Sequence, residues 1–366
     1  MWYKIKNEDD VISPSLLVYP DRIEKNIQKM IAIAADVNKL RPHVKTYKIA
    51  EIIELQLKYG IRKFKCATIA EAELLANCNV KDVLLAIQPV AKNIHRFFEL
   101  LLKYPNVQFS TIVDNKETIQ TFSSIAKEKN VHVHLWLDIN NGMNRTGMPA
   151  GESAVELYQL INNSHNLVAR GLHAYDGHIR DTDVNVRKSR CDDAFSEVAN
   201  LKKKIESMGM KVPVIVAGGT PSFPIHVKRK DVEVSPGTTL LWDEGYSQLF
   251  PDMKFLHAAV LVSRIISKPK EDYLCLDLGH KSVASEMSFP RVKLLNMDNT
   301  QQISHSEEHL VLSSTDADRY KIGQLVYAIP MHICPTVPKY KEVQIVENNL
   351  ITNTWQIKAR DKKITI

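Results

Sequence analysis

The sequence predicts a parallel (β/α)8 barrel followed by a smaller, mostly β domain. Eight short apolar or β-branched runs between residues 40 and 237 alternate with longer stretches whose apolar residues recur every three or four positions. This alternation is typical of parallel sheets, and eight is the number of strands that closes a barrel. After about residue 251 the long helical stretches cease and short apolar runs separated by turn residues follow, which indicates the β domain.

The predicted barrel strands are residues 40–46, 63–69, 83–89, 109–113, 133–139, 169–175, 212–218 and 231–237. An earlier apolar run at residues 15–19 is left out of the barrel, and residues 153–163 show the single buried face of a connecting helix. An open doubly wound sheet is the alternative, because alternation alone does not show closure. We expect the barrel at 13–250 and the β domain at 251–366, with residues 1–12 packing against the β domain.

The composition is that of a globular protein that binds neither nucleic acid nor membrane. Of the 366 residues, 44% are hydrophobic and 25% charged, and the basic residues behind the net charge of +6 are interleaved with acidic ones. The five cysteines are scattered without a CxxC pair, so neither a disulfide framework nor a zinc knuckle is indicated. The N-terminus lacks an apolar signal core and no apolar run approaches ~18 residues, so we expect a cytoplasmic protein.

The segment "RPHVKTYK", residues 41–48, contains a candidate nucleophilic lysine. Functional residues of a parallel barrel lie at the C-terminal ends of its strands, and the first predicted strand ends at Lys45. Burial beside Arg41, His43 and Lys48 would favour an unprotonated amine, which Schiff-base formation requires. The alternative is a surface lysine whose charge stays in solvent.

The seventh predicted strand runs into "VAGGTPS", which resembles a phosphate-binding turn. Paired glycines, Gly218 and Gly219, let backbone N–H groups approach a phosphate, and Thr220 and Ser222 add hydroxyl groups. Phosphate sites near strands seven and eight recur in this architecture. A Gly-Gly pair alone is equally consistent with an ordinary tight turn.

Two further loops carry polar side chains to the same predicted rim. In "LDINNGMNRTGM", Arg145 follows a Gly/Asn turn from which its guanidinium can point back over the barrel, although pairing with a helix carboxylate is an equal alternative. In "HAYDGHIR", Tyr175 and His178 place a phenol and an imidazole after the sixth strand. His178 is therefore a candidate general base, although a lone histidine is more often structural.

The β domain contains "IPMHICPT", with His332 and Cys334 two residues apart. In a strand these side chains would face the same side. Two ligands are too few for a closed structural site, but water and substrate can complete an open one. Imidazole with thiolate favours zinc, with manganese as a second candidate metal. The alternative is a chance pair in which Cys334 is a small apolar residue.

Taken in order, these segments resemble motifs of the D-threonine aldolase and D-serine dehydratase family, pyridoxal-phosphate enzymes with an alanine-racemase-type barrel. "SPSLLVYPDRIEKNI", "RPHVKTYK", "GMNRTG", "YDGH", "GGTPS" and "HICPT" carry the resemblance over nearly the whole chain. It implies that Lys45 rather than Lys48 holds pyridoxal 5'-phosphate, and that the protein is a homodimer acting on a small D-amino acid. Tyr47 departs from the histidine that the motif more often has.

The resemblance implies a lyase that depends on pyridoxal phosphate and a divalent metal and acts on D-β-hydroxy amino acids. Cys334 is similar to the dehydratases, which convert D-serine to pyruvate and ammonia. The "YDGH" loop and the Pro335–Thr336 pair are more similar to the aldolases, which cleave D-threonine to glycine and an aldehyde. We favour the aldolase by a small margin. An amino-acid racemase would need no metal pair, and a non-catalytic pyridoxal-phosphate-binding protein would not need the β domain.

Overall fold

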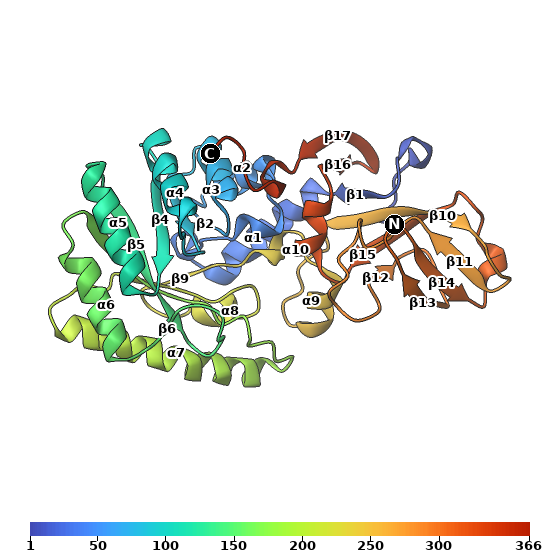
Figure 1. The fold of residues 1–366 in the computed structure, drawn as a ribbon. Helices are drawn as coiled ribbons and strands as arrows, with labels where there is room; N and C mark the ends of the chain where they lie inside the picture. The colour runs from blue at the N-terminus through green and yellow to red at the C-terminus, as the bar shows by residue number, and fades with distance from the viewer. The chain divides into compact units, whose positions relative to one another are not determined.

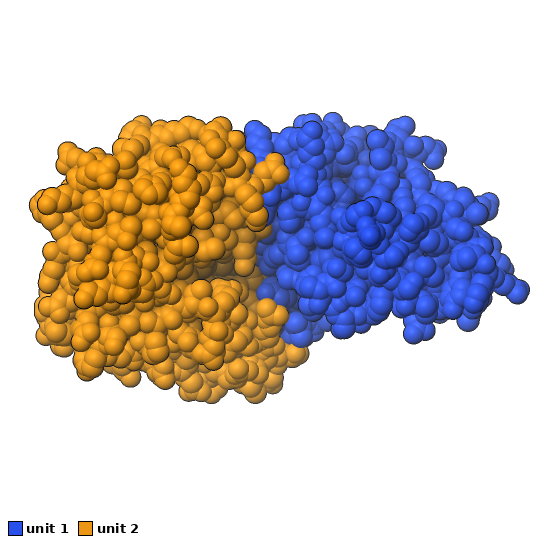
Figure 2. Space-filling view, viewed as in Figure 1, with its two compact units in different colours: residues 1–29, 46–52, 238–360 blue, residues 30–45, 53–237, 361–366 orange.

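The computed structural model describes residues 1–366 and divides into two compact units, each built from separate parts of the chain (Figures 1 and 2). Unit 1, blue in Figure 2, comprises residues 1–29, 46–52 and 238–360. Unit 2, orange in Figure 2, comprises residues 30–45, 53–237 and 361–366. No helix in either unit combines the length and apolar content needed to cross a membrane.

Unit 2 contains seven hydrogen-bonded parallel strands in the order β2-β3-β4-β5-β7-β8-β9. Each corresponds to one of the predicted barrel strands, and a two-residue strand, β6, pairs with the end of β5. Their bounds are β2 Lys63–Cys66, β3 Asp82–Leu85, β4 Gln108–Val113, β5 Val133–Asn140, β6 Met148–Pro149, β7 Leu167–Ala174, β8 Val214–Ala217 and β9 Val232–Val234.

The segment 40–43 closes the ring between the first and last of these strands. Leu40 forms a parallel bridge to Val234 of β9, and His43 forms one to Lys65 of β2. The Lys65 N–H donates to the carbonyl of Pro42 at 2.9 Å. Because Pro42 has no N–H of its own, this edge is reduced to isolated bridges rather than a regular strand. The closed barrel is therefore confirmed over the open sheet.

Helices follow the barrel strands, and several of them begin at a side chain that caps the first turn. Thr68 accepts a hydrogen bond from the N–H of Glu71, and Asn115 accepts one from Thr118. The helices α5, α6 and α7 pack along the outside of β5 and β7 (Figure 1). The bounds are α1 Pro20–Ala34, α2 Ala50–Lys58, α3 Ile69–Asn77, α4 Lys92–Lys103, α5 Lys116–Glu128, α6 Glu152–Asn163, α7 Val184–Ser207 and α8 Phe223–His226.

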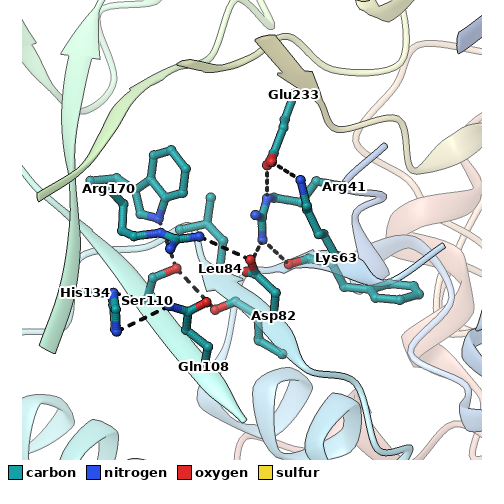
Figure 3. A network of polar contacts seen from close by, with 12 residues as sticks. Arg41, Lys63, Asp82, Leu84, Gln108, Ser110, His134, Arg170 and Glu233 are labelled. Carbon is teal, nitrogen blue, oxygen red and sulfur yellow. Dashed lines mark hydrogen bonds and ion pairs between the residues drawn. The ribbon is translucent and has the colours of Figure 1, made fainter. Parts of the chain in front are cut away.

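A buried ionic network fills the barrel at the N-terminal ends of its strands (Figure 3). The fully buried Arg41 donates to Glu233 of β9 at 2.7 Å and to Asp82 of β3 at 2.6 Å. Lys63 also pairs with Glu233, and Arg170 with Asp82. Two carboxylates from different strands therefore pair with the one guanidinium of Arg41 at this end of the barrel.

An apolar layer separates this network from the C-terminal ends of the strands. It consists of Leu84, Ile112, Trp136 and Val216, which come from β3, β4, β5 and β8. The indole N–H of Trp136 donates to the hydroxyl of Ser110 at 2.9 Å, so its one polar atom is satisfied. The barrel interior at the N-terminal ends of the strands therefore stabilises the fold, and a functional site is expected at the C-terminal ends.

Unit 1 is built around a mixed sheet in the order β13-β14-β11-β10-β1-β16-β17, with β15 pairing to β10 and β12. All of its pairs are antiparallel except β1 with β16, which is parallel. The run at residues 15–19 forms β1 of this sheet, outside the barrel. The bounds are β1 Ser15–Val18, β10 Ala259–Ser267, β11 Tyr273–Leu276, β12 Val292–Leu294, β13 Thr300–His305, β14 Leu310–Ser314, β15 Leu325–Pro330, β16 Glu342–Glu347 and β17 Leu350–Gln356.

The core of unit 1 includes the N-terminal residues. Tyr3, Ile5 and Val11 are buried in one cluster with Val260 and Tyr327. The strand β13 has no apolar pattern by which the sequence could have predicted it. In "TQQISH" of β13 no residue is buried, so the apolar alternation that marks a strand is missing.

We predict that Arg41→Met lowers the free energy of unfolding by about 3 kcal/mol, because it leaves two carboxylates without their shared buried partner. Chemical denaturation followed by circular dichroism measures the change. The matched control is Lys188→Met, which breaks an exposed ion pair with Asp192 and should cost less than about 0.5 kcal/mol. Equal stability of the two variants would contradict the role of the network.

Candidate functional site

Three positive side chains surround Tyr175 at the C-terminal ends of the barrel strands. Tyr175 directly follows β7, and its ring centroid lies 4.8 Å from Cζ of Arg145 and 6.0 Å from Nζ of Lys45. Nζ of Lys65 lies 5.7 Å from the same centroid. The structure thus brings Lys45, Arg145 and Tyr175 together, as expected for one site, and adds Lys65. We call these four residues the barrel-mouth cluster.

Lys45 lies in a 3-10 turn, η3 (Val44–Thr46), rather than in the strand predicted for residues 40–46. Its backbone N–H donates to Nδ1 of the buried His43 at 3.2 Å, which ties the turn to the edge of the barrel. The rival Lys48 belongs to unit 1 and has a left-handed backbone, with φ of 58°. Of the two lysines, Lys45 is the one in the barrel-mouth cluster.

The turn after β8 leaves no room for side chains at its two glycines. A Cβ on Gly218, whose φ is +75°, would lie 2.7 Å from the hydroxyl oxygen of Ser222. A Cβ on Gly219 would lie 3.0 Å from the ring of Tyr175. The N–H of Gly218 donates to the carbonyl of Ala174 at 3.2 Å, and a phosphate contact of these glycines stays a prediction. The hydroxyl oxygen of Thr220 accepts the N–H of Gly237 at 3.0 Å, which joins this turn to the segment after β9.

Ser222 is held inside the loop by a buried carboxylate. Its hydroxyl donates to Asp176 at 2.7 Å and accepts the N–H of Gly219 at 3.2 Å. Asp176 also accepts from Nε2 of His226 at 2.7 Å. Burial alone would raise the pKa of Asp176, but the hydrogen bonds from His226 and Ser222 lower it. Asp176 therefore anchors the glycine turn, and a direct contact of Ser222 with phosphate stays a prediction.

Asp176, His226 and Cys191 form a compact group whose potential ligand atoms lie within 4.8 Å of one another. Their spacing would allow a metal ion, but Asp176 already accepts hydrogen bonds from His226 and from the Cys191 thiol. Burial and the charge of Asp176 raise the pKa of Cys191 to about 12, so the thiol keeps its proton. The group holds the loop as it stands, and it is also a candidate metal site, because a bound metal ion would itself displace the thiol proton.

His178 follows Tyr175 in the turn after β7 and packs against the arginine loop. A Cβ on Gly142, whose φ is +108°, would lie 3.1 Å from Nε2 of His178. Nδ1 of His178 is buried without a hydrogen-bond partner in the protein. A buried nitrogen of this kind requires a partner, and a bound substrate or water can supply it.

Sequence reasoning missed Lys65, His173 and Asp138, which form a buried chain of contacts at the barrel mouth. Nζ of Lys65 lies 3.4 Å from Nε2 of His173, and Nδ1 of His173 lies 2.6 Å from Asp138. Burial, and next the charge of Lys45, lower the pKa of Lys65 to about 7. The strand-end rule that selected Lys45 did not select Lys65, because Lys65 is only the third residue of the predicted strand "KFKCATI", whereas the observed β2 ends at Cys66.

In unit 1, His332 and Cys334 do not lie in a strand, and that expectation is wrong. β15 ends at Pro330, and His332 is the N-cap of the short helix α10 (Ile333–Thr336). The N–H of Ile333 donates to the buried Asp243 at 3.0 Å instead of to a neighbouring strand, which turns the chain. The His332 and Cys334 side chains nevertheless meet and form a hydrogen bond.

The surroundings of this pair suit a metal ion. Burial alone would lower the pKa of His332, but the hydrogen bond and charge of Cys334 raise it to about 9, so a metal ion would have to displace a proton from this pair. Nδ1 of His332 lies 2.5 Å from Glu286, the carboxylate partner that metal-binding histidines usually have. Sγ of Cys334 lies 3.2 Å from the hydroxyl of Thr46 and 3.4 Å from that of Thr238. An imidazole with a thiolate fits an open zinc-type site.

Two family matches cover most of the chain. Residues 18–244 match the family described as "Alanine racemase, N-terminal domain". Residues 258–346 match the one described as "Putative serine dehydratase domain". The first match covers the barrel strands and the barrel-mouth cluster, and the second ends before β17.

Known proteins are similar to this chain over nearly its whole length. The chain is 24% identical over 371 residues to a 3-hydroxy-D-aspartate aldolase of Paracoccus denitrificans (strain Pd 1222), covering 97% of this chain and 94% of the relative. It is 25% identical to a D-serine dehydratase of Dictyostelium discoideum, over 96% and 98% of the two chains. The crystal structure of D-threonine aldolase from Filomicrobium marinum superimposes with a TM-score of 0.89 at 24% identity, covering 98% and 97%.

We predict that Gly219→Val weakens retention of pyridoxal phosphate at least about tenfold, because the new side chain collides with Tyr175 and fills the cradle. Equilibrium dialysis against the cofactor measures the dissociation constant. Gly151→Ala is the control, since a Cβ there meets no atom within 4 Å. Unchanged affinity in the Gly219 variant would remove this turn from the phosphate site.

Proposed function

Because the chain belongs to the alanine racemase N-terminal domain family, and to its group of D-threonine aldolases and D-serine dehydratases, we propose that it is a pyridoxal-phosphate-dependent lyase acting on D-β-hydroxy amino acids. The observation that carries the proposal is the barrel-mouth cluster, which puts the Lys45 amine beside Tyr175 and Arg145. When bound, pyridoxal phosphate supplies an aldehyde for a lysine amine and a ring that accepts electrons from a bond at the substrate Cα.

The residues present fit this cofactor. Lys45 would hold the aldehyde, and the backbone at Gly218 and Gly219 would receive the phosphate together with Thr220. The loop that carries them is anchored by Asp176, so Ser222 supports the cradle from behind. Arg145 keeps the mouth positive, which suits both a phosphate and a substrate carboxylate.

His332 and Cys334 would hold one divalent metal, with zinc as the first candidate. A metal with open positions acts as a Lewis acid on a hydroxyl group, here the substrate's β-hydroxyl.

The proposed reaction is retro-aldol cleavage of D-threonine to glycine and acetaldehyde. Cleavage needs a base that takes the β-hydroxyl proton, and the unpartnered Nδ1 of His178 is available for it. Dehydration of D-serine to pyruvate and ammonia is the second candidate. That reaction needs a base at Cα, for which Lys45 would serve, and Cys334 favours it through the resemblance to dehydratases.

We predict that protein purified without chelator contains about one divalent metal ion per chain, with zinc as the first candidate. His332→Ala should lose this metal because only one side-chain ligand, Cys334, remains, and elemental analysis measures the difference. His309→Ala is the control, since His309 is an exposed histidine of the same unit. Full lyase activity after exhaustive chelation would exclude the metal from the reaction.

We predict that the holoenzyme releases glycine and acetaldehyde from D-threonine, and that Lys45→Ala abolishes turnover. His178→Ala should lower the rate by about 100-fold, the size expected for a lost general base. Product chromatography with a coupled aldehyde assay measures both, and the exposed His95→Ala serves as control. Pyruvate from D-serine with no glycine from D-threonine would make the dehydratase the correct function.

A further inference from the structure

Lys65 is a buried lysine that the proposed reaction does not use. It stands in β2 between the buried Phe64 and Cys66, and its exposed fraction is 3%. Burying an ammonium group away from water is costly, so lysines are rarely buried without a partner. Its position at the barrel mouth therefore requires a physical explanation.

The contacts of Lys65 define a direction for its hydrogen bond. The carboxylate of Asp138 can only accept, so the hydrogen of His173 lies on Nδ1, 2.6 Å from Asp138. Burial, and next the charge of Lys65, lower the pKa of His173, so the imidazole is neutral and Nε2 carries a lone pair. Lys65 donates to this lone pair across 3.4 Å. His173 and Asp138 thus hold the amine in place and can stabilise a proton on it.

The charges around Lys65 come from several elements of the barrel. Lys45 of η3, Arg41 of the closing segment and Arg145 of the loop after β5 are positive. Asp138 of β5 and Asp176 after β7 are negative. Burial is the largest cause, and Lys45 the next, of a pKa near 7 for Lys65. In mildly alkaline solution the Lys65 amine is therefore largely unprotonated.

The amines of Lys45 and Lys65 share one aromatic neighbour. Nζ of Lys45 lies 6.0 Å and Nζ of Lys65 lies 5.7 Å from the ring centroid of Tyr175. A lysine must lose its proton before it attacks an aldehyde, and a nucleophile is commonly activated by an adjacent base that a third group orients. The barrel mouth contains all three parts in Lys45, Lys65 and the His173–Asp138 pair.

We propose that Lys65 is the proton acceptor that activates Lys45 for covalent attachment of the cofactor aldehyde. The N–H bond of the Lys45 ammonium breaks and a new N–H bond forms at Lys65. Lys45 becomes the neutral nucleophile, and Lys65 becomes an ammonium that donates to His173 and is balanced by Asp138. Lys65 acts through Lys45, and this inference rests on the proposed function.

The experiment mixes cofactor-free protein with pyridoxal 5'-phosphate and follows the absorbance of the lysine-bound cofactor between pH 6 and pH 9. The attachment rate of the unmodified protein should rise as pH passes through about 7, where Lys65 loses its proton. Lys65→Met should attach the cofactor about 100-fold more slowly at pH 7.5, the usual size of base catalysis, and recover only in more alkaline solution. Circular dichroism confirms that the variants fold.

Two further variants separate a base from a buried positive charge. Lys65→Arg keeps the charge but cannot release a proton near neutral pH, so it should be as slow as Lys65→Met. Lys63→Met is the matched control, because Lys63 lies two residues earlier in β2 and pairs with Glu233. It should attach the cofactor at the unmodified rate. A fast Lys65→Arg protein, or a pH-independent rate in the unmodified protein, would overturn the inference.

Borohydride trapping distinguishes this inference from the proposed function. After reduction, peptide mapping should find the cofactor on Lys45 in the unmodified protein and in Lys65→Met. Cofactor trapped elsewhere in Lys45→Ala would overturn the choice of nucleophile and, with it, the role of Lys65. If the cofactor is on Lys45 but the Lys65 variants attach it at the unmodified rate, only the role of Lys65 is lost.

Discussion

The buried pairing of Arg41 with Glu233 and Asp82 is the interaction on which the barrel depends. Regular strand pairing is interrupted at the closing segment because Pro42 cannot donate, and only isolated bridges join it to its neighbours. The guanidinium compensates for this by joining β9 to β3 from inside the ring, at 2.7 Å and 2.6 Å. Its donors form a fixed planar fork that can serve two carboxylates together, which an ammonium group cannot reproduce.

Closure at this point also decides where the candidate nucleophile lies. Only three residues lie between Arg41 and Lys45, so the chain that enters at the ionic network reaches the barrel mouth within one short segment. The hydrogen bond from Lys45 N–H to His43 ends the extended backbone and begins the turn η3. A few residues thereby link the ionic network at one end of the barrel to the barrel-mouth cluster at the other. This separation of stability from chemistry along the strands is characteristic of (β/α)8 barrels.

The barrel mouth combines excess positive charge with a few buried carboxylates that have specific partners. Asp176 is engaged by His226 and Ser222, and it holds the glycine turn rather than neutralising the mouth. Asp138 is engaged by His173, which in turn contacts Lys65. The positive charge therefore remains available for an anionic ligand. The anchored turn is preorganised before any ligand arrives, which lowers the conformational cost of binding.

Periodicity and strand-end position were enough to predict the barrel, the β domain and the joint placement of Lys45, Arg145 and Tyr175, because these follow from local pattern and parallel topology. They did not reveal that Lys65 lies near Asp138 and His173. These residues are about 70 and about 110 positions further along the chain, and they become neighbours of Lys65 only when the sheet closes. Periodicity and strand-end position also misplaced His332 and Cys334 in a strand. A backbone N–H bound by the distant Asp243 turned that segment into a helix, and local sequence does not record such a partner.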